Sequence, residues 1–469
     1  MPTSSGSAVS FSACPASSTN SSSDVIPVTI EVPAKHPLLL LKGELAWPQL
    51  EEITAKHWQA SGKNVDGGRG RPFDVAFYTR VIVLMLILRL HSRELERELK
   101  ENAVARLFVE VPQPTEALVR DHANLDRTAR ALGAAGMEEL NALILNKAME
   151  LKFADPEVLS ADTTAQELPI GYPNEPGIFR QAAQRIGRVL ERLKKIGVKI
   201  KDGALEPVKQ LLRLVKEHHL FAKTKEERHA VLEQIIEQGE QMAQVAEELG
   251  EELVPRPESV LKRAGAKLGQ LSSFIRRLTP QVRSWMHSGK VAKDKLLHAG
   301  LEQARALVRN KAGKKWEFGF KWLIAKLGGG YVFGQMFTKA SGESRMPVLA
   351  VKLYKKLLGA ALAPALAIYD RGGWAKKTIQ DLFSLGVTKI GIQPKGQASW
   401  LVEGADRDTV RSERGMTEGV IGTLKGNFYG FNKPKQRSTQ NIELAGQGSL
   451  VSLNLNKLLR DIQMKLKTV

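Results

Sequence analysis

The chain has 469 residues, enough for two or three domains with a substantial core. Its 69 Lys and Arg residues against 50 Asp and Glu give a formal net charge of +19, which favours an anionic partner, nucleic acid above all. The single cysteine, Cys14, excludes an intramolecular disulfide and a cysteine zinc knuckle, and it fits a reducing cytoplasmic compartment.

The N-terminal segment, residues 1–30, is a Ser-rich leader for which we expect disorder. It has neither the basic start nor the apolar centre of a secretory signal, so we expect no export. The longest apolar run, Val81 to Leu88, is too short to cross a bilayer, which takes about 20 residues. We therefore predict a buried core helix there and no membrane partner.

Residues 31–150 have a helical pattern and are predicted to form an N-terminal DNA-binding or dimerisation region. Ser92 is a candidate N-cap for a helix that places Leu95 and Leu99 on one face. Two short helices with a cap between them fit a DNA-reading helix-turn-helix, and they fit a plain helical bundle equally well.

Residues 151–469 are predicted to form a catalytic domain that begins with a strand ending at Asp162 and carries a helical insertion at about 178–312. Within the insertion, basic residues recur at three- and four-residue steps and so share one helix face. Such a stripe either neutralises successive DNA phosphates or is a solvated face. The stripe residues are Arg185, Arg188, Arg192 and Lys195.

The pattern after the insertion alternates between strands and helices. A strand at 316–326 and its hairpin partner at 331–337 flank a turn at Gly328. Further elements are expected as a helix at 346–358, a strand at 363–369, a helix at 374–385, a strand at 388–393 and a C-terminal helix around 450–460. The predicted fold is a mixed α/β sheet with a large helical insertion after its first strand, preceded by a helical domain.

Asp162 and Asp370 each stand at the predicted C-terminal end of a strand. In open α/β sheets, sites form outside those strand ends, and carboxylates are the ligands that Mg²⁺ prefers. Taken one at a time, each aspartate is also explained as a turn former or a helix cap. A third acid, Glu418, shares one face of a predicted helix with Arg414 and Lys425, which fits either a metal ligand between phosphate contacts or a salt-bridged surface.

These segments together resemble the bacterial insertion-sequence DDE transposases. The spacing Arg414-x₃-Glu418-x₆-Lys425 is similar to the signature around the third carboxylate of that family. Leu159-Ser-Ala-Asp162-Thr-Thr and Tyr369-Asp370-Arg-Gly-Gly-Trp resemble its first- and second-aspartate regions. The resemblance covers most of the chain from about residue 70.

One departure concerns the position three residues before the signature arginine, where the family usually has tyrosine and this chain has Arg411. Arg411 either replaces the tyrosine with a phosphate contact or leaves its role unfilled. The same pattern selects Glu418 rather than Glu413 as the third acid.

The resemblance implies a ribonuclease-H-like core in which Asp162, Asp370 and Glu418 hold two Mg²⁺ ions, with Mn²⁺ as a substitute. It also implies that Arg414 and Lys425 bind phosphates of double-stranded DNA at transposon ends and target, and that a homodimer acts on DNA in the bacterial cytoplasm. Two alternatives stay open: a nuclease of the same core without strand transfer, and an inactive DNA-binding derivative.

Overall fold

The computed structural model describes most of the chain after the leader. The predicted leader, residues 1–30 with Cys14, lies outside the described residues. The described residues are 32–33, 35–63, 65, 73–111, 122–311, 314–339, 341–394, 396 and 399–468.

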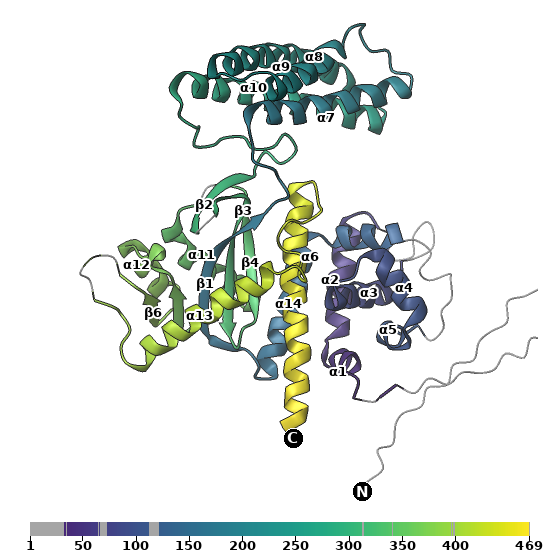
Figure 1. Cartoon of the computed structure of the whole chain (residues 1–469). Coiled ribbons are helices and arrows are strands. Elements are labelled where there is room, and N and C mark those ends of the chain that lie inside the picture. Colours follow the sequence, from purple (N-terminus) through teal and green to yellow (C-terminus); the bar gives the residue numbers. More distant parts are fainter. Residues whose placement is uncertain are drawn as a thin grey trace, which may run out of the picture. The chain divides into compact units, whose positions relative to one another are not determined.

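Within these ranges the fold is mixed α/β, with 14 α-helices and an open six-stranded sheet (Figure 1). The helices are α1 (Pro37–Glu44), α2 (Trp47–Ala60), α3 (Val75–Leu88), α4 (Ser92–Glu101), α5 (Ala103–Val109), α6 (His122–Glu150), α7 (Glu175–Lys195), α8 (Glu206–Leu220), α9 (Lys225–Leu253), α10 (Ser259–Ser288), α11 (Met346–Leu358), α12 (Lys376–Ser384), α13 (Ala405–Lys425) and α14 (Thr439–Thr468). The strands are β1 (Asp155–Glu167), β2 (Arg305–Lys311), β3 (Lys314–Gly328), β4 (Val332–Phe337), β5 (Leu366–Tyr369) and β6 (Lys389–Ile392), and two short 3₁₀ helices are η1 (Glu343–Arg345) and η2 (Arg371–Gly373).

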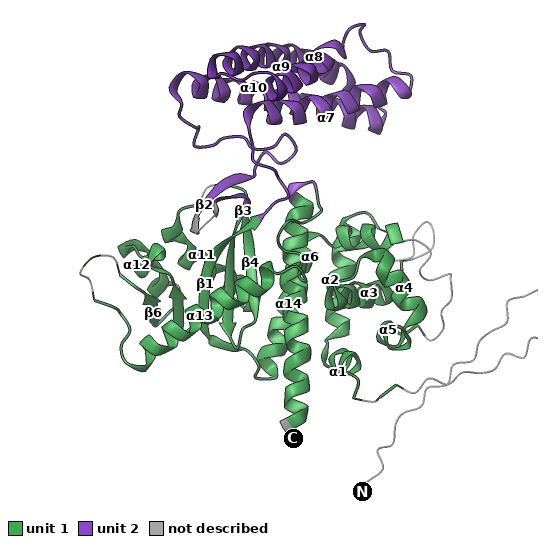
Figure 2. Ribbon diagram, in the orientation of Figure 1, with its two compact units in different colours: residues 1–166, 321–436, 440–469 green, residues 167–320, 437–439 purple. Residues whose placement is uncertain are grey.

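The chain divides into two compact units (Figure 2). Unit 1 comprises residues 1–166, 321–436 and 440–469, and unit 2 comprises residues 167–320 and 437–439. Most of the sheet and the N-terminal helices belong to unit 1, whereas α7 to α10 belong to unit 2.

The sheet has the strand order β2-β3-β1-β5-β6, with β4 also paired to β3. β5 runs parallel to both β1 and β6, while β2 and β4 run antiparallel to β3. The prediction was wrong for residues 305–311, which it assigned to the helical insertion and which form β2. This segment pairs with the first half of β3, and β4 pairs with the second half.

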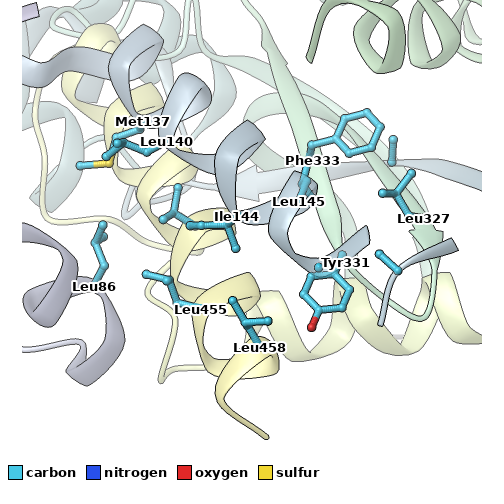
Figure 3. Close-up of a cluster of buried hydrophobic side chains, with 14 of the residues drawn as sticks. Leu86, Met137, Leu140, Ile144, Leu145, Leu327, Tyr331, Phe333, Leu455 and Leu458 are labelled. Carbon is cyan, nitrogen blue, oxygen red and sulfur yellow. The ribbon is translucent and has the colours of Figure 1, made fainter. Parts of the chain in front are cut away.

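Successive side chains of β1 point to opposite faces of the sheet, as the two-residue period of a strand requires. Leu159 and Ala161 point into the main core of unit 1, whereas Ser160 lies against α13. Figure 3 shows that core, in which side chains from α3, α6, β3, β4 and α14 meet. The N-terminal helices therefore share a hydrophobic core with the sheet.

The apolar run in α3 is mostly buried in this core, as predicted. Among the described residues, no single helix is both long and apolar enough to span a membrane, although α3 and α4 taken together, bent by 103° at their junction, meet those criteria. The predicted cap of α4 is one residue off: His91 is the N-cap and Ser92 the first helical residue.

Unit 2 is built around a bundle of α7, α8, α9 and α10 with its own apolar core. The long helices α9 and α10 approach closely because glycine faces glycine: a Cβ on Gly265 would lie 2.8 Å from the carbonyl oxygen of Gly250. A capping box between Thr224 and Glu227 fixes the start of α9. The helical character predicted for this insertion is thus confirmed for α7 to α10.

Candidate active site

Asp162 lies within β1 and not at its end, which corrects the prediction. The strand continues for five further residues, to Glu167. The β-branched Thr163 and Thr164 favour an extended backbone, and β3, the neighbouring strand, is long enough to pair with the extension. The backbone N–H of Leu168 donates to the carbonyl of Phe318 at 2.9 Å, so this pairing persists past the strand end.

Asp370 directly follows β5, as predicted, and the strand register brings it beside Asp162. The paired residues of β1 and β5 are Val158 with Leu366, Leu159 with Ala367, and Ser160 with Ile368. Two residues further along each strand stand Asp162 and Asp370. Neighbouring strands lie about 4.8 Å apart, so the two aspartates occupy adjacent positions.

Both aspartates belong to the sheet face that α13 covers. Ser160 and Thr164, two residues to either side of Asp162, both contact that helix: Thr417 donates to Ser160 at 2.7 Å, and the Lys425 ammonium lies 3.5 Å from the Thr164 hydroxyl. Ile368, two residues before Asp370, packs with Val410 of α13. Side chains two apart along a strand share a face, so Asp162 and Asp370 share this one.

The surroundings of Asp370 are suited to a cation. Its Oδ1 is buried, and no hydrogen-bond partner for it exists among the described residues. A buried carboxylate oxygen without a donor is energetically costly unless an ion or water fills the gap. The backbone at Gly372 leaves room beside the carboxylate, since a Cβ there would lie 3.0 Å from Oδ1.

Glu418 lies on α13, one residue after the Thr417 contact to β1, and its side chain is exposed. Across the described ranges, no group of three Asp, Glu, His or Cys side chains is close enough to bind one metal ion. The register therefore makes Asp162 and Asp370 neighbours, but the predicted trio is not assembled in this conformation.

Glu413, the acid that the signature passed over, has a different role. Its carboxylate is buried and bonds to the fully buried ammonium of Lys326 on β3. Glu413 and Thr417 lie one helical turn apart and both face the sheet. Glu418, about 100° further around the helix, is left facing solvent.

The basic residues of α13 differ in environment. Lys425 is half-buried at the last position of the helix, close to Thr164, and Arg414 is half-buried one turn before Glu418. Arg411 is exposed and forms a 3.4 Å ion pair with Asp408. All three share a flank with Glu418, because they are separated from it by seven, four and seven residues.

A further acid, Glu343 in η1, was not singled out from the sequence. It accepts hydrogen bonds from Thr163 (2.9 Å), Lys321 (2.5 Å) and the Tyr369 hydroxyl. Thr163 follows Asp162 and Tyr369 precedes Asp370, so the Glu343 carboxylate accepts hydrogen bonds from a sequence neighbour of each aspartate. One signal could have found it: Glu343 is the only acidic residue between Glu317 and Asp370.

The electrostatics of this network keep Glu343 ionised. Burial alone would raise the pKa of Glu343, but hydrogen bonds from Lys321, Tyr369 and Thr163 together with the charge of Lys321 outweigh burial and lower it. Burial, the charge of Glu343 and the nearby charges of Asp162 and Asp370 all raise the pKa of Tyr369, so its hydroxyl stays protonated and donates.

The basic stripe predicted for the insertion lies on α7 in unit 2. Arg188 and Arg192 line a groove of about 390 Å³, and Arg263 and Lys267 of α10 line its other side. Lys195 is exposed at the end of α7. The groove lining contains four cations and no acid.

Arg185 adjoins the same cations from a half-buried position. Its guanidinium lies over Gly300, where a Cβ would collide with it. Burial lowers the pKa of Arg185, and the positive charges of Arg188 and Arg437 lower it further. Like charges gathered in this way favour an anionic partner.

Three other arginines of α10 form ion pairs with glutamates of unit 2. Arg276 bonds to Glu247, Arg277 bonds to Glu302, and Arg283 bonds to Glu233 and Glu240. Throughout the described part of unit 2, no such ion pair exists for Arg188, Arg192, Arg263 or Lys267.

Comparison of the chain with models of protein families, with curated proteins and with solved structures finds no match.

Proposed function

We propose that the protein is a DDE-type DNA transposase with a ribonuclease-H-like core. The observation that carries this proposal is the β1–β5 register, which makes Asp162 and Asp370 neighbours on one face of the sheet. β1 and β5 are parallel neighbours, and the next strand along the chain lies on opposite sides of them: β2 lies beyond β3 on one side, and β6 lies on the other. Such a switch point is where open α/β sheets bind ligands.

Divalent ions fit the donors at this position, since Asp370 has a buried, unpartnered oxygen and the ligands are carboxylates. Asp162 and Asp370 would hold two Mg²⁺ ions, for which Mn²⁺ can substitute, and Glu418 would complete the site. Glu418 is exposed and forms no ion pair with any described residue, so no other partner holds its carboxylate. Bound ions supply charge neutralisation and a more acidic attacking hydroxyl.

The protein's own groups would position the DNA. Arg414 and Lys425, on the flank of α13 that carries Glu418, would bind phosphates beside the scissile bond. In the cleavage step, the water oxygen forms a bond to the scissile phosphorus and the bond from phosphorus to the 3′-oxygen breaks. The 3′-oxygen takes a proton and leaves as a 3′-hydroxyl. That hydroxyl then attacks a target phosphorus, and the target's own 3′-oxygen leaves with a proton, so the number of phosphodiester bonds is unchanged in the second step. A homodimer would hold two transposon ends.

The direct test uses the purified chain, Mg²⁺, a supercoiled target and candidate transposon-end DNA, taken from inverted repeats if the coding region is flanked by them. We expect cleaved ends and joined products. Asp162→Asn, Asp370→Asn and Glu418→Gln should each abolish both while leaving DNA affinity mostly intact, because they remove ion ligands and not phosphate contacts.

Asp408→Asn is the matched control, since Asp408 is an exposed acid on the same helix. It should retain activity. Nicking without joining would favour the nuclease, and binding without cleavage would favour the inactive derivative. Full cleavage by Asp370→Asn would refute the proposed site.

A further inference from the structure

Unit 2 contains a second concave site, away from the basic groove of α7 and α10. It has a volume of about 910 Å³ and lies where α7 and α9 begin and α8 ends. Ligand pockets in proteins are typically about 300–1,000 Å³ in volume. The helices that line this pocket can be followed in unit 2 in Figure 2.

The walls of this pocket are cationic. Arg180, Lys216, Lys225 and Arg228 all line it, and none of them has an ion pair with any described residue of the bundle. A concave site with four uncompensated positive charges attracts anions and concentrates them.

The acids near the pocket are already engaged. Glu175, the acidic residue of the lining, forms a 2.5 Å ion pair with Lys295. The Glu227 carboxylate, at the start of α9, accepts the backbone N–H groups of Lys223 and Thr224 at 2.7 and 3.0 Å. Neither acid forms an ion pair with any of the four cations of the wall.

The floor of the pocket is apolar and in part aromatic. Leu232 is buried there, and the half-buried Trp285 lies with its ring centroid 6.0 Å from that of His229. Leu220, at 44% exposure, adds an apolar edge. An apolar, partly aromatic lining next to four cations suits a ligand that has an aromatic part and a negatively charged part.

We propose that this pocket binds a nucleoside phosphate moiety. The base would lie against Trp285 and Leu232, and the phosphate would accept from Arg180 and Arg228, whose guanidinium groups pair with phosphate in a bidentate fashion. Three histidines, at positions 218, 219 and 229, add hydrogen-bonding groups. Burial, and then the charges of Arg228 and His219, lower the pKa of His218 against a weaker opposing effect of Glu175.

The moiety could be a free nucleotide or a nucleotide within a strand, and the chemistry is the same for both. The inference goes beyond the proposed transposase activity, because the pocket lies in unit 2 and the carboxylates lie in unit 1. Asp162→Asn should therefore leave the pocket's ligand binding unchanged, so either proposal can fail without the other.

The test is calorimetric titration of the full chain with AMP, adenosine, inorganic phosphate and a short single-stranded oligonucleotide. We expect AMP to bind with one site per chain, and more tightly than adenosine or phosphate alone. The double substitution Arg180→Gln/Arg228→Gln should weaken AMP binding at least about tenfold, because each arginine supplies a charged hydrogen bond. Trp285→Ala should weaken AMP more than phosphate.

The matched control is Lys209→Gln/Arg213→Gln, which removes the same charge from two exposed positions of α8 that do not line the pocket. It should bind AMP as the unsubstituted chain does. An oligonucleotide that displaces AMP from the unsubstituted chain indicates a strand as the source, and failure to displace it indicates a free nucleotide. No AMP binding at millimolar concentration, or equal loss in the control, would overturn the proposal.

Discussion

Alternation of side chains along a strand explains why two aspartates 208 positions apart become neighbours at the candidate site. Parallel pairing of β1 with β5 aligns Ser160 with Ile368, and the two-residue period then places Asp162 and Asp370 on the same face. That both acids belong to or follow strands could be predicted from the sequence, because each follows a short apolar run, but the pairing of β1 with β5 could not be read from a local pattern. Glu343 is marked in the sequence only as the one acid between Glu317 and Asp370, and its role could not be predicted, because its three hydrogen-bond partners lie 22 to 180 residues away in the chain.

At this scale, Glu343→Gln tests whether the network positions the aspartates. The substitution removes the charge that Lys321 and Tyr369 face, so we expect the cleavage rate to fall about 10- to 100-fold, as for residues that orient metal ligands. The Mg²⁺ concentration that gives half-maximal cleavage should rise as well, which a purely structural role would not produce.

Glu138→Gln provides the control, since Glu138 is also a half-buried acid of unit 1 with a 2.5 Å bond to a lysine, Lys356. It should alter neither the rate nor the Mg²⁺ dependence. If Glu343→Gln lowers the melting temperature without changing the Mg²⁺ dependence, Glu343 has no positioning role.

At the scale of elements, sequence patterns predicted strands and helices well where apolar periodicity was strong. The helix at 346–358 was predicted to the residue, and the hairpin of β3 and β4 is present. β2 was missed because Arg305–Lys311 is rich in basic residues and gains its strand conformation from pairing with β3. The end of β1 was placed too early because polar residues follow Asp162, although β3 extends far enough to pair with them.

The buried ion pair between α13 and β3 gives an element-scale prediction. Glu413→Ala would leave the Lys326 ammonium buried and unpaired, because Lys326 has 0% exposure. We expect the free energy of unfolding of unit 1 to fall by about 3–5 kcal/mol in urea titrations.

The double substitution Glu413→Leu/Lys326→Met should recover most of that loss, since both charges are removed and apolar volume is restored. A double variant as unstable as Glu413→Ala would show that the pair is not what fixes α13 to the sheet.

At the scale of the whole molecule, the net charge of +19 is unevenly distributed. The α7 stripe could be predicted from spacing, but its partners Arg263 and Lys267 could not, since they come from another helix and join it through the fold. The sequence likewise could not separate compensated from uncompensated arginines on α10, because their acidic partners lie on α9 and in the loop after α10.

The groove of α7 and α10 should therefore contribute to DNA affinity in a salt-dependent way. Arg188→Gln/Arg263→Gln should weaken binding at low salt and reduce the slope of log K against log salt by about 2, roughly one for each phosphate that is no longer neutralised. Arg276→Gln/Arg283→Gln removes the same charge from arginines that are already in ion pairs. The slope of log K against log salt should therefore change far less in this variant than in Arg188→Gln/Arg263→Gln. Equal changes in both variants would mean that the groove is not a DNA surface.

Asp162 and Asp370 are proposed to bind divalent metal ions together, and electron paramagnetic resonance of Mn²⁺ added to the DNA-bound protein measures this binding. We predict that Asp162→Asn and Asp370→Asn each lose bound Mn²⁺ while Asp408→Asn retains it. Mn²⁺ binding that survives both aspartate substitutions, or that is absent from the unsubstituted protein on DNA, would show that the two aspartates are not a metal site.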